Sequence, residues 1–252
     1  GIADLTSIVP TISTSLEHIS LDNNPIPDLS SLTRFKLLRG IEAHDISLKT
    51  LKLFDMPSLD WVSVYNNQVN RIEIENVPAL FNLNLGNNNL EDVSSLADFM
   101  AAQPNPNNWH FNISLYENGI KDISALAKIA RLGHVSLQDN SIRDITPLKA
   151  KTEIWHLDLQ RNDISVLADT FDAYQIRANI YLDGNTLLCS EVSNLENSTA
   201  NIQWTGDCGE DTDGDSVVDS NDAFPDDIAA SIDGDGDALP DEWNAGFSQA
   251  DS

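Results

Sequence analysis

The feature that most constrains this fold is a short pattern that recurs along most of the chain. Each copy has aliphatic residues five and three positions before an asparagine and another two positions after it, as in "VSVYNNQV" (62–69) and "LDLQRNDI" (157–164). The asparagines that anchor the matching copies are Asn24, Asn67, Asn88, Asn118, Asn140, Asn162 and Asn185. Between the first two anchors, "IEAHDI" (41–46) fits the frame with His44 in the asparagine position.

The spacing of these anchors predicts a stacked architecture. From Asn67 onward, neighbouring anchors lie 21, 30, 22, 22 and 23 residues apart. Alternating aliphatic residues predict a short strand with one buried face. One such coil cannot bury its apolar face alone, so coils stack and share a core. A column of asparagines can then satisfy the turn backbone groups that stacking removes from water. Chance alternation in a β-sandwich would not produce such a regular period.

Several copies continue as "DLSSL" (28–32), "DVSSL" (92–96), "DISAL" (122–126) or "DITPL" (144–148). The combined pattern resembles the leucine-rich-repeat family, in its internalin-like class with a repeat of about 22 residues. The resemblance implies an α/β solenoid over residues 1–188, a right-handed horseshoe with a parallel sheet on its concave face. Because "IADLTSI" (2–8) aligns with "IPDLSSL" (26–32), we expect the chain to begin inside a repeat and to belong to a larger parent protein. The longest interval holds "FMAAQPNPNNWHF" (99–111), either a functional loop or a tolerated bulge.

The chain contains two cysteines, Cys189 and Cys208, which together favour one disulfide and an oxidising compartment. Residues 189–208 resemble the cysteine-containing C-terminal cap of extracellular leucine-rich repeats. That resemblance implies a Cys189–Cys208 bond, with Trp204 covering the apolar end of the solenoid. Two free thiols or a metal-binding pair remain as alternatives. The lack of a further cysteine or a neighbouring histidine argues against zinc.

The segment 209–252 is strongly acidic. From Asp207 onward the chain has 15 aspartates or glutamates and no lysine or arginine. Their spacing matches a calcium-binding loop, with side-chain ligands at positions 1, 3, 5, 9 and 12 and a backbone carbonyl at position 7. The first copy is Asp211, Asp213, Asp215, Val217, Asp219 and Asp222, and the second is Asp233, Asp235, Asp237, Leu239, Asp241 and Asn244. Calcium prefers six to eight oxygen ligands, so the cation would turn mutually repelling carboxylates into a cage.

"DTDGDSVVDSNDAFP" and "DGDGDALPDEW" also resemble bacterial thrombospondin type-3 repeats and related EF-hand-like loops. The resemblance implies Ca2+ as a cofactor and an irregular segment that calcium stabilises. Both copies depart from the pattern, with Ser216 and Ala238 at the sixth position and Asn244 at the last position of the second. We therefore expect weak calcium affinity in both loops, and weaker affinity in the second loop than in the first. Magnesium fits less well because it demands octahedral geometry. An acidic disordered tail is the alternative.

The concave face of the predicted horseshoe offers candidate ligand-binding residues. Its outward positions lie six, four and two residues before each asparagine, which gives Leu38, Gly40 and Glu42 in the copy assigned to His44. Exposed aromatic residues with polar neighbours are typical binding anchors, although exposed positions of any repeat protein must hold some residue. His134 and His156 occupy the same column in adjacent coils, and they could instead hold a transition metal or form a solvated pair. The candidates are Trp61, Tyr65, Tyr116, His134, His156 and Tyr181.

The net charge of −26 argues against nucleic acid or an anionic membrane surface as a partner. No apolar run reaches the roughly 18 residues of a membrane span. No nucleophile motif such as GxSxG is present, so we expect no enzyme. The sequence favours an extracellular bacterial module, secreted or on the cell surface, that recognises a protein or glycan ligand or mediates adhesion. The alternatives are a structural spacer of a surface protein and a targeting module of a secreted enzyme.

Overall fold

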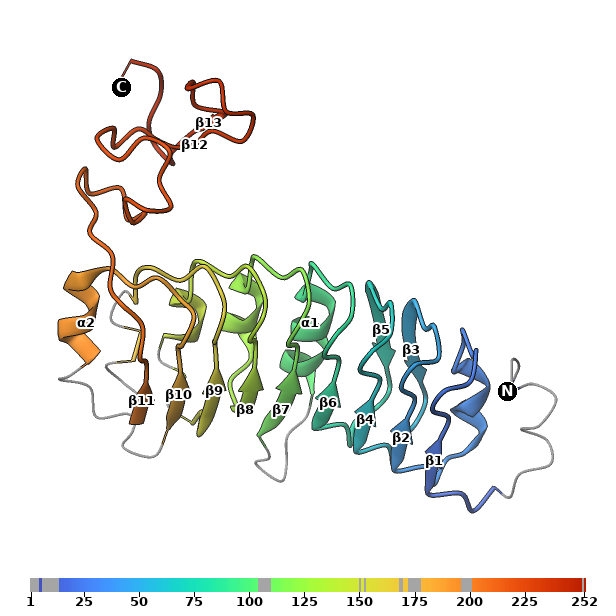
Figure 1. Cartoon of the computed structure of the whole chain (residues 1–252). Coiled ribbons are helices and arrows are strands. Elements are labelled where there is room, and N and C mark those ends of the chain that lie inside the picture. Colours follow the sequence, from blue (N-terminus) through green and yellow to red (C-terminus); the bar gives the residue numbers. More distant parts are fainter. Residues whose placement is uncertain are drawn as a thin grey trace.

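The computed structural model describes residues 5, 14–103, 110–149, 151, 153–167, 170–171, 178–195, 201–250 and 252. The repeats form a solenoid along one parallel sheet, with the strands side by side in chain order (Figure 1). The predicted α/β solenoid with a parallel sheet along one face is confirmed. The nine strands are β1 (His18–Ser20), β2 (Gly40–Glu42), β4 (Trp61–Ser63), β6 (Asn82–Asn84), β7 (Phe111–Ser114), β8 (Leu132–Ser136), β9 (His156–Asp158), β10 (Asn179–Tyr181) and β11 (Asn201–Gln203).

In each three-residue strand of the sheet, the middle residue points into the core. Ile41 pairs with Val62, and Val62 pairs with Leu83. All three are at most 1% exposed, whereas Trp61 and Ser63 on either side of Val62 are half-buried. The aliphatic alternation in the sequence is therefore the inward and outward alternation of the strands. Because each coil covers its neighbour, the buried residues form one continuous core.

The anchoring asparagines link each coil to the one before it. The Asn162 side-chain carbonyl accepts the Ile142 N–H at 3.0 Å. Its amide donates to the carbonyls of Leu137 (3.0 Å), Leu159 (3.0 Å) and Gln160 (3.3 Å). The residue before each anchor is left-handed, as at Arg161 with φ 51°. The turn thus follows each strand in the same way, and its backbone groups are satisfied by the asparagine.

The second copy follows a frame different from the one expected. Asp45 has the left-handed φ of 55° that elsewhere precedes the anchor, so Ile46, fully buried, occupies the asparagine position. The strand register agrees, because Gly40 pairs with Trp61 and Glu42 with Ser63. Placing His44 in the asparagine position was therefore wrong. Leu38 was wrong as an outward residue, since it is 0% exposed. The outward residues of this coil are Gly40, Glu42 and His44.

Other hydrogen bonds replace those that an asparagine would make at Ile46. The Ile26 N–H, which such an asparagine would accept, donates to the Asn24 backbone carbonyl at 2.8 Å. The Asn67 side-chain carbonyl accepts two N–H groups, from Ile46 at 3.0 Å and Leu48 at 3.1 Å. An apolar residue is tolerated here because both neighbouring coils satisfy the backbone groups around it.

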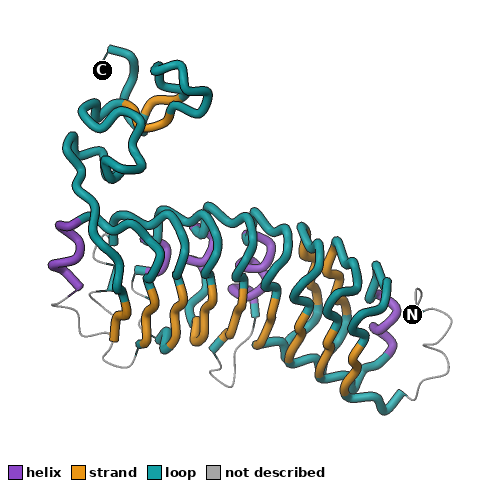
Figure 2. The backbone as a smooth tube through the Cα atoms, viewed as in Figure 1, coloured by secondary structure: helices purple, strands orange, loops and turns teal. Residues whose placement is uncertain are grey.

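The side of the solenoid opposite the main sheet is irregular (Figure 2). It contains a second parallel pair, β3 (Thr50–Phe54) with β5 (Arg71–Glu75), which the sequence pattern did not indicate. Helix α1 (Ser94–Ala102) precedes the inserted loop, of which residues 104–109 lie outside the described part of the chain. Most of the first half-repeat, residues 1–4 and 6–13, also lies outside it. The repeats also contain the 3-10 helices η2 (Ser30–Arg34), η3 (Ser124–Lys128) and η4 (Thr146–Leu148).

The C-terminal cap contains helix α2 (Cys189–Leu195) and β11. The predicted Cys189–Cys208 disulfide is confirmed. Strand β11 pairs in parallel with β10, so the cap adds a ninth strand that the repeat pattern did not predict. Trp204 is partly buried against the core, at the end of the solenoid where it was expected. Within the described residues, no helix combines the length and the apolar character that crossing a membrane requires.

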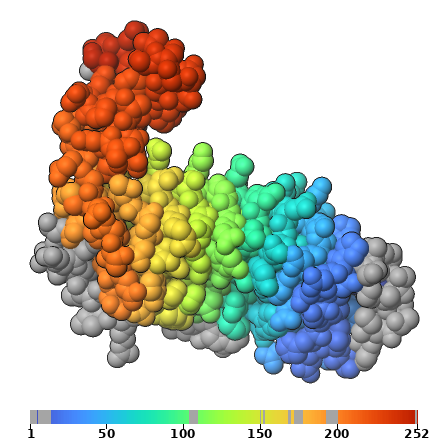
Figure 3. Space-filling view, in the orientation of Figure 1, coloured from blue at the N-terminus to red at the C-terminus, as the bar shows by residue number. Residues whose placement is uncertain are grey.

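The acidic segment stands off the capped end of the solenoid as a small separate lobe (Figure 3). It is attached through Gly209, which bridges to Leu188, and through Val218, which is 1% exposed. The Ser165 hydroxyl donates to the Ser216 carbonyl at 2.7 Å. Within the lobe, β12 (Ala230–Ile232) pairs with β13 (Glu242–Trp243) in antiparallel fashion.

Candidate functional site

The outward residues of the nine strands, continued two residues past each strand, form the surface that we call the concave face. It carries four carboxylates, and no lysine or arginine stands at any of its positions in the described strands. Its members, strand by strand, are His18, Ser20, Asp22; Gly40, Glu42, His44; Trp61, Ser63, Tyr65; Asn82, Asn84, Gly86; Asn112, Ser114, Tyr116; His134, Ser136, Gln138; His156, Asp158, Gln160; Asn179, Tyr181, Asp183; and Asn201, Gln203, Thr205.

All six predicted ligand-binding residues lie on the concave face, and each is half-buried. Near the N-terminal end, Trp61 stacks on His18 with ring centroids 6.2 Å apart, and Tyr65 contacts His44 at 3.9 Å. The other end of the sheet has a second group that consists of His134, His156 and Tyr181, with the His156 and Tyr181 rings 5.1 Å apart. Tyr116 lies between the two groups. The face therefore presents rings along most of its length rather than one isolated aromatic.

Two glycines allow large rings to lie against the sheet. A Cβ at Gly40 would lie 2.3 Å from Trp61 Cε2, and a Cβ at Gly86 would lie 2.2 Å from Tyr116 Cζ. In each case the glycine is on the neighbouring strand, in the same column as the aromatic residue. These glycines were not among the predicted site residues. A glycine that precedes an aromatic residue by one repeat in the same outward column would have revealed Gly86, whereas the misplaced frame of the second copy put Gly40 in a different column from Trp61.

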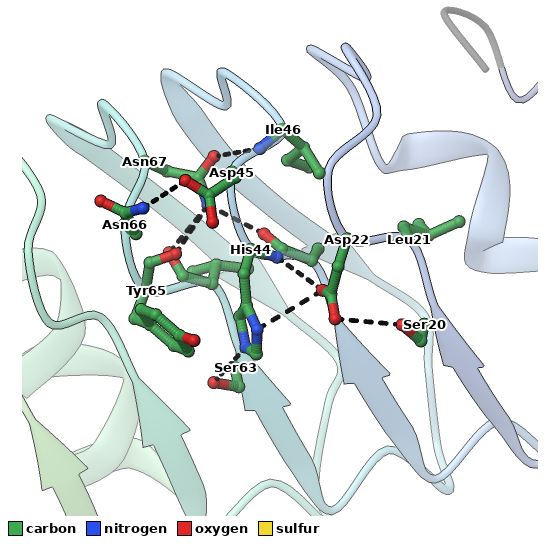
Figure 4. Close-up of polar contacts among 12 residues, drawn as sticks. Ser20, Leu21, Asp22, His44, Asp45, Ile46, Ser63, Tyr65, Asn66 and Asn67 are labelled. Carbon is green, nitrogen blue, oxygen red and sulfur yellow. Dashed lines mark hydrogen bonds and ion pairs between the residues drawn. The ribbon is translucent and has the colours of Figure 1, made fainter. Parts of the chain in front are cut away.

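A polar chain crosses three strands next to Tyr65 (Figure 4). His44 Nε2 lies 2.9 Å from the Ser63 hydroxyl, and His44 Nδ1 lies 3.4 Å from Asp22 Oδ1. Hydrolytic triads place a carboxylate, an imidazole and a hydroxyl in this same order. However, Asp22 Oδ1 already accepts the His44 backbone N–H at 2.8 Å, and the Val64 N–H next to Ser63 donates to the Asn84 carbonyl. Neither of these two backbone N–H groups is free to stabilise an oxyanion. The chain instead orients the His44 ring against Tyr65.

His134 and His156 are stacked, with centroids 4.0 Å apart and planes at 9°. Burial lowers the pKa of His134, and the neighbouring His156 lowers it further. Burial also raises the pKa of Asp158. Among the described residues, the groups of three or more potential metal ligands are confined to the acidic lobe, so this pair has no third ligand. A transition-metal site at the pair is not supported.

The lowered pKa of His134 gives a pH dependence with a definite sign. The unfolded chain binds a proton on this residue more readily than the folded one, so its contribution to stability is complete above about pH 6.5 and decreases as the pH falls through the folded pKa. We expect His134→Asn, which introduces the residue found elsewhere in this column, to flatten the urea-unfolding free energy between pH 7 and 5 at saturating calcium. The raised pKa of Asp158 changes stability with pH in the opposite direction, but Asp158 is present in both proteins and so does not distinguish them. Parallel curves for the two proteins would contradict the assignment.

The two acidic loops have the same internal hydrogen bonds. In the first, Asp211 accepts the N–H of Gly214 at 2.8 Å and of Ser216 at 3.1 Å. In the second, Asp233 accepts the N–H of Gly236 at 2.7 Å and of Ala238 at 2.9 Å. In each loop the third and fifth residues accept the N–H two positions ahead, so Val217 donates to Asp215 and Leu239 donates to Asp237. The sequence repeat is thus also a repeat of backbone geometry.

The sixth position of each loop keeps the turn despite its departure from glycine. Ser216 has φ 75° and Ala238 has φ 63°, both in the left-handed region that glycine favours. The carboxylate at the ninth position accepts a hydrogen bond from the second residue of its loop, Asp219 from the Thr212 N–H at 2.8 Å and Asp241 from the Gly234 N–H. Ligands at this position of calcium loops often act through water.

The first three aspartates of each loop converge. Their carboxylate oxygens lie within 4.8 Å of one another in both the 211–215 trio and the 233–237 trio. Asp213 Oδ2 is buried and accepts no hydrogen bond from any described residue. Burial raises the pKa of Asp213, and the charges of Asp215 and Asp211 raise it further. An all-oxygen set with an unpaired buried carboxylate oxygen suits a hard cation such as calcium.

The last position distinguishes the two loops. Asp222 is 8% exposed, and its pKa is raised by burial and by the first trio's charges. Asn244, predicted as the equivalent ligand of the second loop, instead donates to Asp215 Oδ2 at 2.6 Å and to the Ile228 carbonyl at 3.1 Å. It also accepts the Ser231 hydroxyl at 2.8 Å. Asn244 therefore joins the two loops, and the first loop is the more complete site.

No sequence model of a protein family matches this chain, and no curated protein matches it in sequence. Solved structures resemble its fold. An internalin from Listeria monocytogenes is 20% identical with a TM-score of 0.61, over 81% of this chain and 60% of the internalin. An internalin C2 from the same organism is 18% identical (TM-score 0.62; 80% and 92%), and a leucine-rich-repeat domain of a Shigella effector is 16% identical (TM-score 0.55; 79% and 85%). At these identities the similarity shows a leucine-rich-repeat fold alone.

Proposed function

We propose that the chain is a calcium-dependent extracellular recognition module of a bacterial surface or secreted protein, whose concave face binds a protein partner. Folds of the internalin type are commonly protein-interaction or adhesion modules. The observation that carries the proposal is the series of half-buried rings on the concave face, two of them seated against glycines of the adjacent strand. Rings held in place in this way can contribute contact area without a large loss of side-chain entropy.

The acidic lobe supports the calcium part of the proposal. Asp211, Asp213, Asp215 and Asp222 would hold the ion in the first loop, and Asp233, Asp235 and Asp237 would hold one in the second. Calcium would supply the positive charge that the segment's own sequence lacks. The lobe contacts the repeats through Ser216, whose carbonyl accepts the Ser165 hydroxyl, so an ordered lobe would set the direction in which the chain leaves the solenoid.

The extracellular setting rests on two chemical requirements. The Cys189–Cys208 disulfide closes the cap, and such bonds persist in oxidising compartments. Loops with weak calcium affinity fill only where calcium is abundant, as it is outside cells, where modules bind with dissociation constants of about 0.1–1 mM. Both requirements are met outside a bacterial cell.

Arrays of proteins and glycans, probed with the calcium-loaded chain, would identify the partner. For a partner found in this way, we expect the double variant Trp61→Ala, Tyr116→Ala to raise the dissociation constant by about 100-fold or more, because buried aromatic anchors typically contribute 2 kcal/mol or more each. The measurement is surface plasmon resonance in millimolar calcium, with circular dichroism melting to confirm that the variant folds.

Phe247→Ala is the matched control, because it removes an aromatic side chain that is 38% exposed in the acidic lobe. It should leave the affinity unchanged. Equal affinity of the wild type and the folded double variant would contradict recognition by the concave face and would favour a spacer. A hit confined to the glycan array would change the class of partner.

A further inference from the structure

The distribution of charge on the concave face suggests the chemistry of its partner. Asp22 contacts Ser20 and His44, and Asp183 accepts hydrogen bonds from Thr205. Asp158 accepts the Gln160 N–H. Glu42 differs, because within the described residues its carboxylate has no hydrogen bond and no ion pair. A carboxylate held on a sheet face without a cation nearby attracts one from outside.

The surroundings of Glu42 follow from the register. Along β2, Gly40 and His44 lie two residues away on either side and face the same way. The Trp61 ring rests over Gly40, and the His44 ring contacts Tyr65. Across the sheet, the small side chains of Ser20 and Ser63 lie opposite Glu42 on β1 and β4. The carboxylate therefore has a ring toward each end of its strand and only small side chains opposite it on both neighbouring strands.

This arrangement has the elements of a cation-binding subsite. A guanidinium or ammonium group above Glu42 would pair with the carboxylate and lie near the Trp61 and Tyr65 rings, whose faces attract cations within about 6 Å. A guanidinium can also make two parallel hydrogen bonds to one carboxylate, which an ammonium cannot. The acidic charge of the whole chain would speed the approach of a basic partner.

We infer that Glu42, Trp61 and Tyr65 form a subsite for an arginine side chain of a basic segment of the partner protein. The inference rests on the proposed recognition function and adds the class of side chain that is recognised. The contacts among His44, Asp22 and Ser63 give it a fixed wall, because they hold the ring that supports Tyr65.

The test uses N-acetylarginine amide as the probe and the full, calcium-loaded chain. The indole N–H resonance of Trp61, assigned with Trp61→Phe, is followed by NMR during the titration. We expect a saturable shift of this resonance and at least a tenfold loss of affinity in Glu42→Gln. N-acetylcitrulline amide, the uncharged analogue, should give no saturable shift. Glu75→Gln, the same substitution at an exposed residue at the end of β5, should bind the probe like the wild type.

An equal response to the citrulline analogue, or unchanged affinity in Glu42→Gln, would overturn the subsite. The outcome is independent of the array experiment. If the partner requires Trp61 and Tyr116 but the arginine probe does not shift Trp61, the subsite is wrong and the recognition function stands. If the probe binds in a Glu42-dependent way but the partner ignores the double variant, the subsite stands and the proposed function fails.

Discussion

Asn162→Ala is expected to lower the free energy of unfolding by about 3–5 kcal/mol, because it leaves one buried N–H without an acceptor and removes three further hydrogen bonds to backbone carbonyls. The Ile142 N–H loses its acceptor, and the carbonyls of Leu137 and Leu159 lose a donor. Asn162 is 6% exposed, so water cannot replace these bonds without opening the coil. The measurement is urea unfolding followed by circular dichroism.

Asn70→Ala is the matched control. Asn70 is exposed and stands outside the asparagine column, so its replacement should change the unfolding free energy by less than about 0.5 kcal/mol. Ile46 shows why the comparison is informative, since the Ile26 N–H in that coil pair has the Asn24 carbonyl as its acceptor, whereas the Ile142 N–H depends on Asn162. Equal stability of the Asn162 and Asn70 variants would show that the column does not hold the coils together.

Calcium removal is expected to unfold the acidic lobe while the solenoid stays folded. Without the cation, each loop places three carboxylates within 4.8 Å of one another, and no basic residue of the lobe offsets them. Bound calcium at about 100 times its dissociation constant stabilises the lobe by about 2.7 kcal/mol. We therefore expect amide exchange in residues 209–250 to accelerate about 100-fold with chelator and to stay slow in the strands from β2 to β10, as measured by mass spectrometry.

In the presence of calcium, Asp213→Asn should accelerate exchange around the first loop, residues 211–222, as the chelator does, because it removes charge from the first trio. Asp226→Asn makes the same change at an exposed residue of the lobe outside both trios, and it should leave exchange unchanged. Because Val218 lies against Gly209 and Ser165 donates to the Ser216 carbonyl, some acceleration should also reach Gly209 and the repeat around Ser165. Exchange that is equally slow with and without chelator would contradict a calcium-dependent fold.

The repeat pattern predicted the solenoid and most of its outward columns, because the asparagine and the left-handed residue before it recur in nearly every coil. It failed in the second copy, where Ala43 and Ile46 occupy the second aliphatic position and the asparagine position. The short strand β11 was missed because the cap has no asparagine turn after it. A pattern read from one sequence locates each coil by its anchoring asparagine, so a coil that lacks this asparagine is placed incorrectly.

Contacts between coils were harder to predict than the coils themselves. The positions of the Trp61 and Tyr116 rings depend on two glycines, which lie one repeat away in the sequence but next to the rings in the folded chain. Asn244 matched a ligand position by spacing, yet its amide donates to Asp215 of the other loop. Loop spacing fixes the local backbone, and the packing of the two loops decides where the final side chain points.

Isothermal titration of calcium into the chelator-treated chain tests the central claim most directly. The account predicts saturable binding with a dissociation constant of about 0.1–1 mM, reduced to the second loop alone in Asp213→Asn, unchanged in Asp226→Asn and not reproduced by magnesium at the same concentration. Heat no greater than that of dilution at about 10 mM calcium, ten times the upper end of that range, or equal binding by Asp213→Asn, would contradict it.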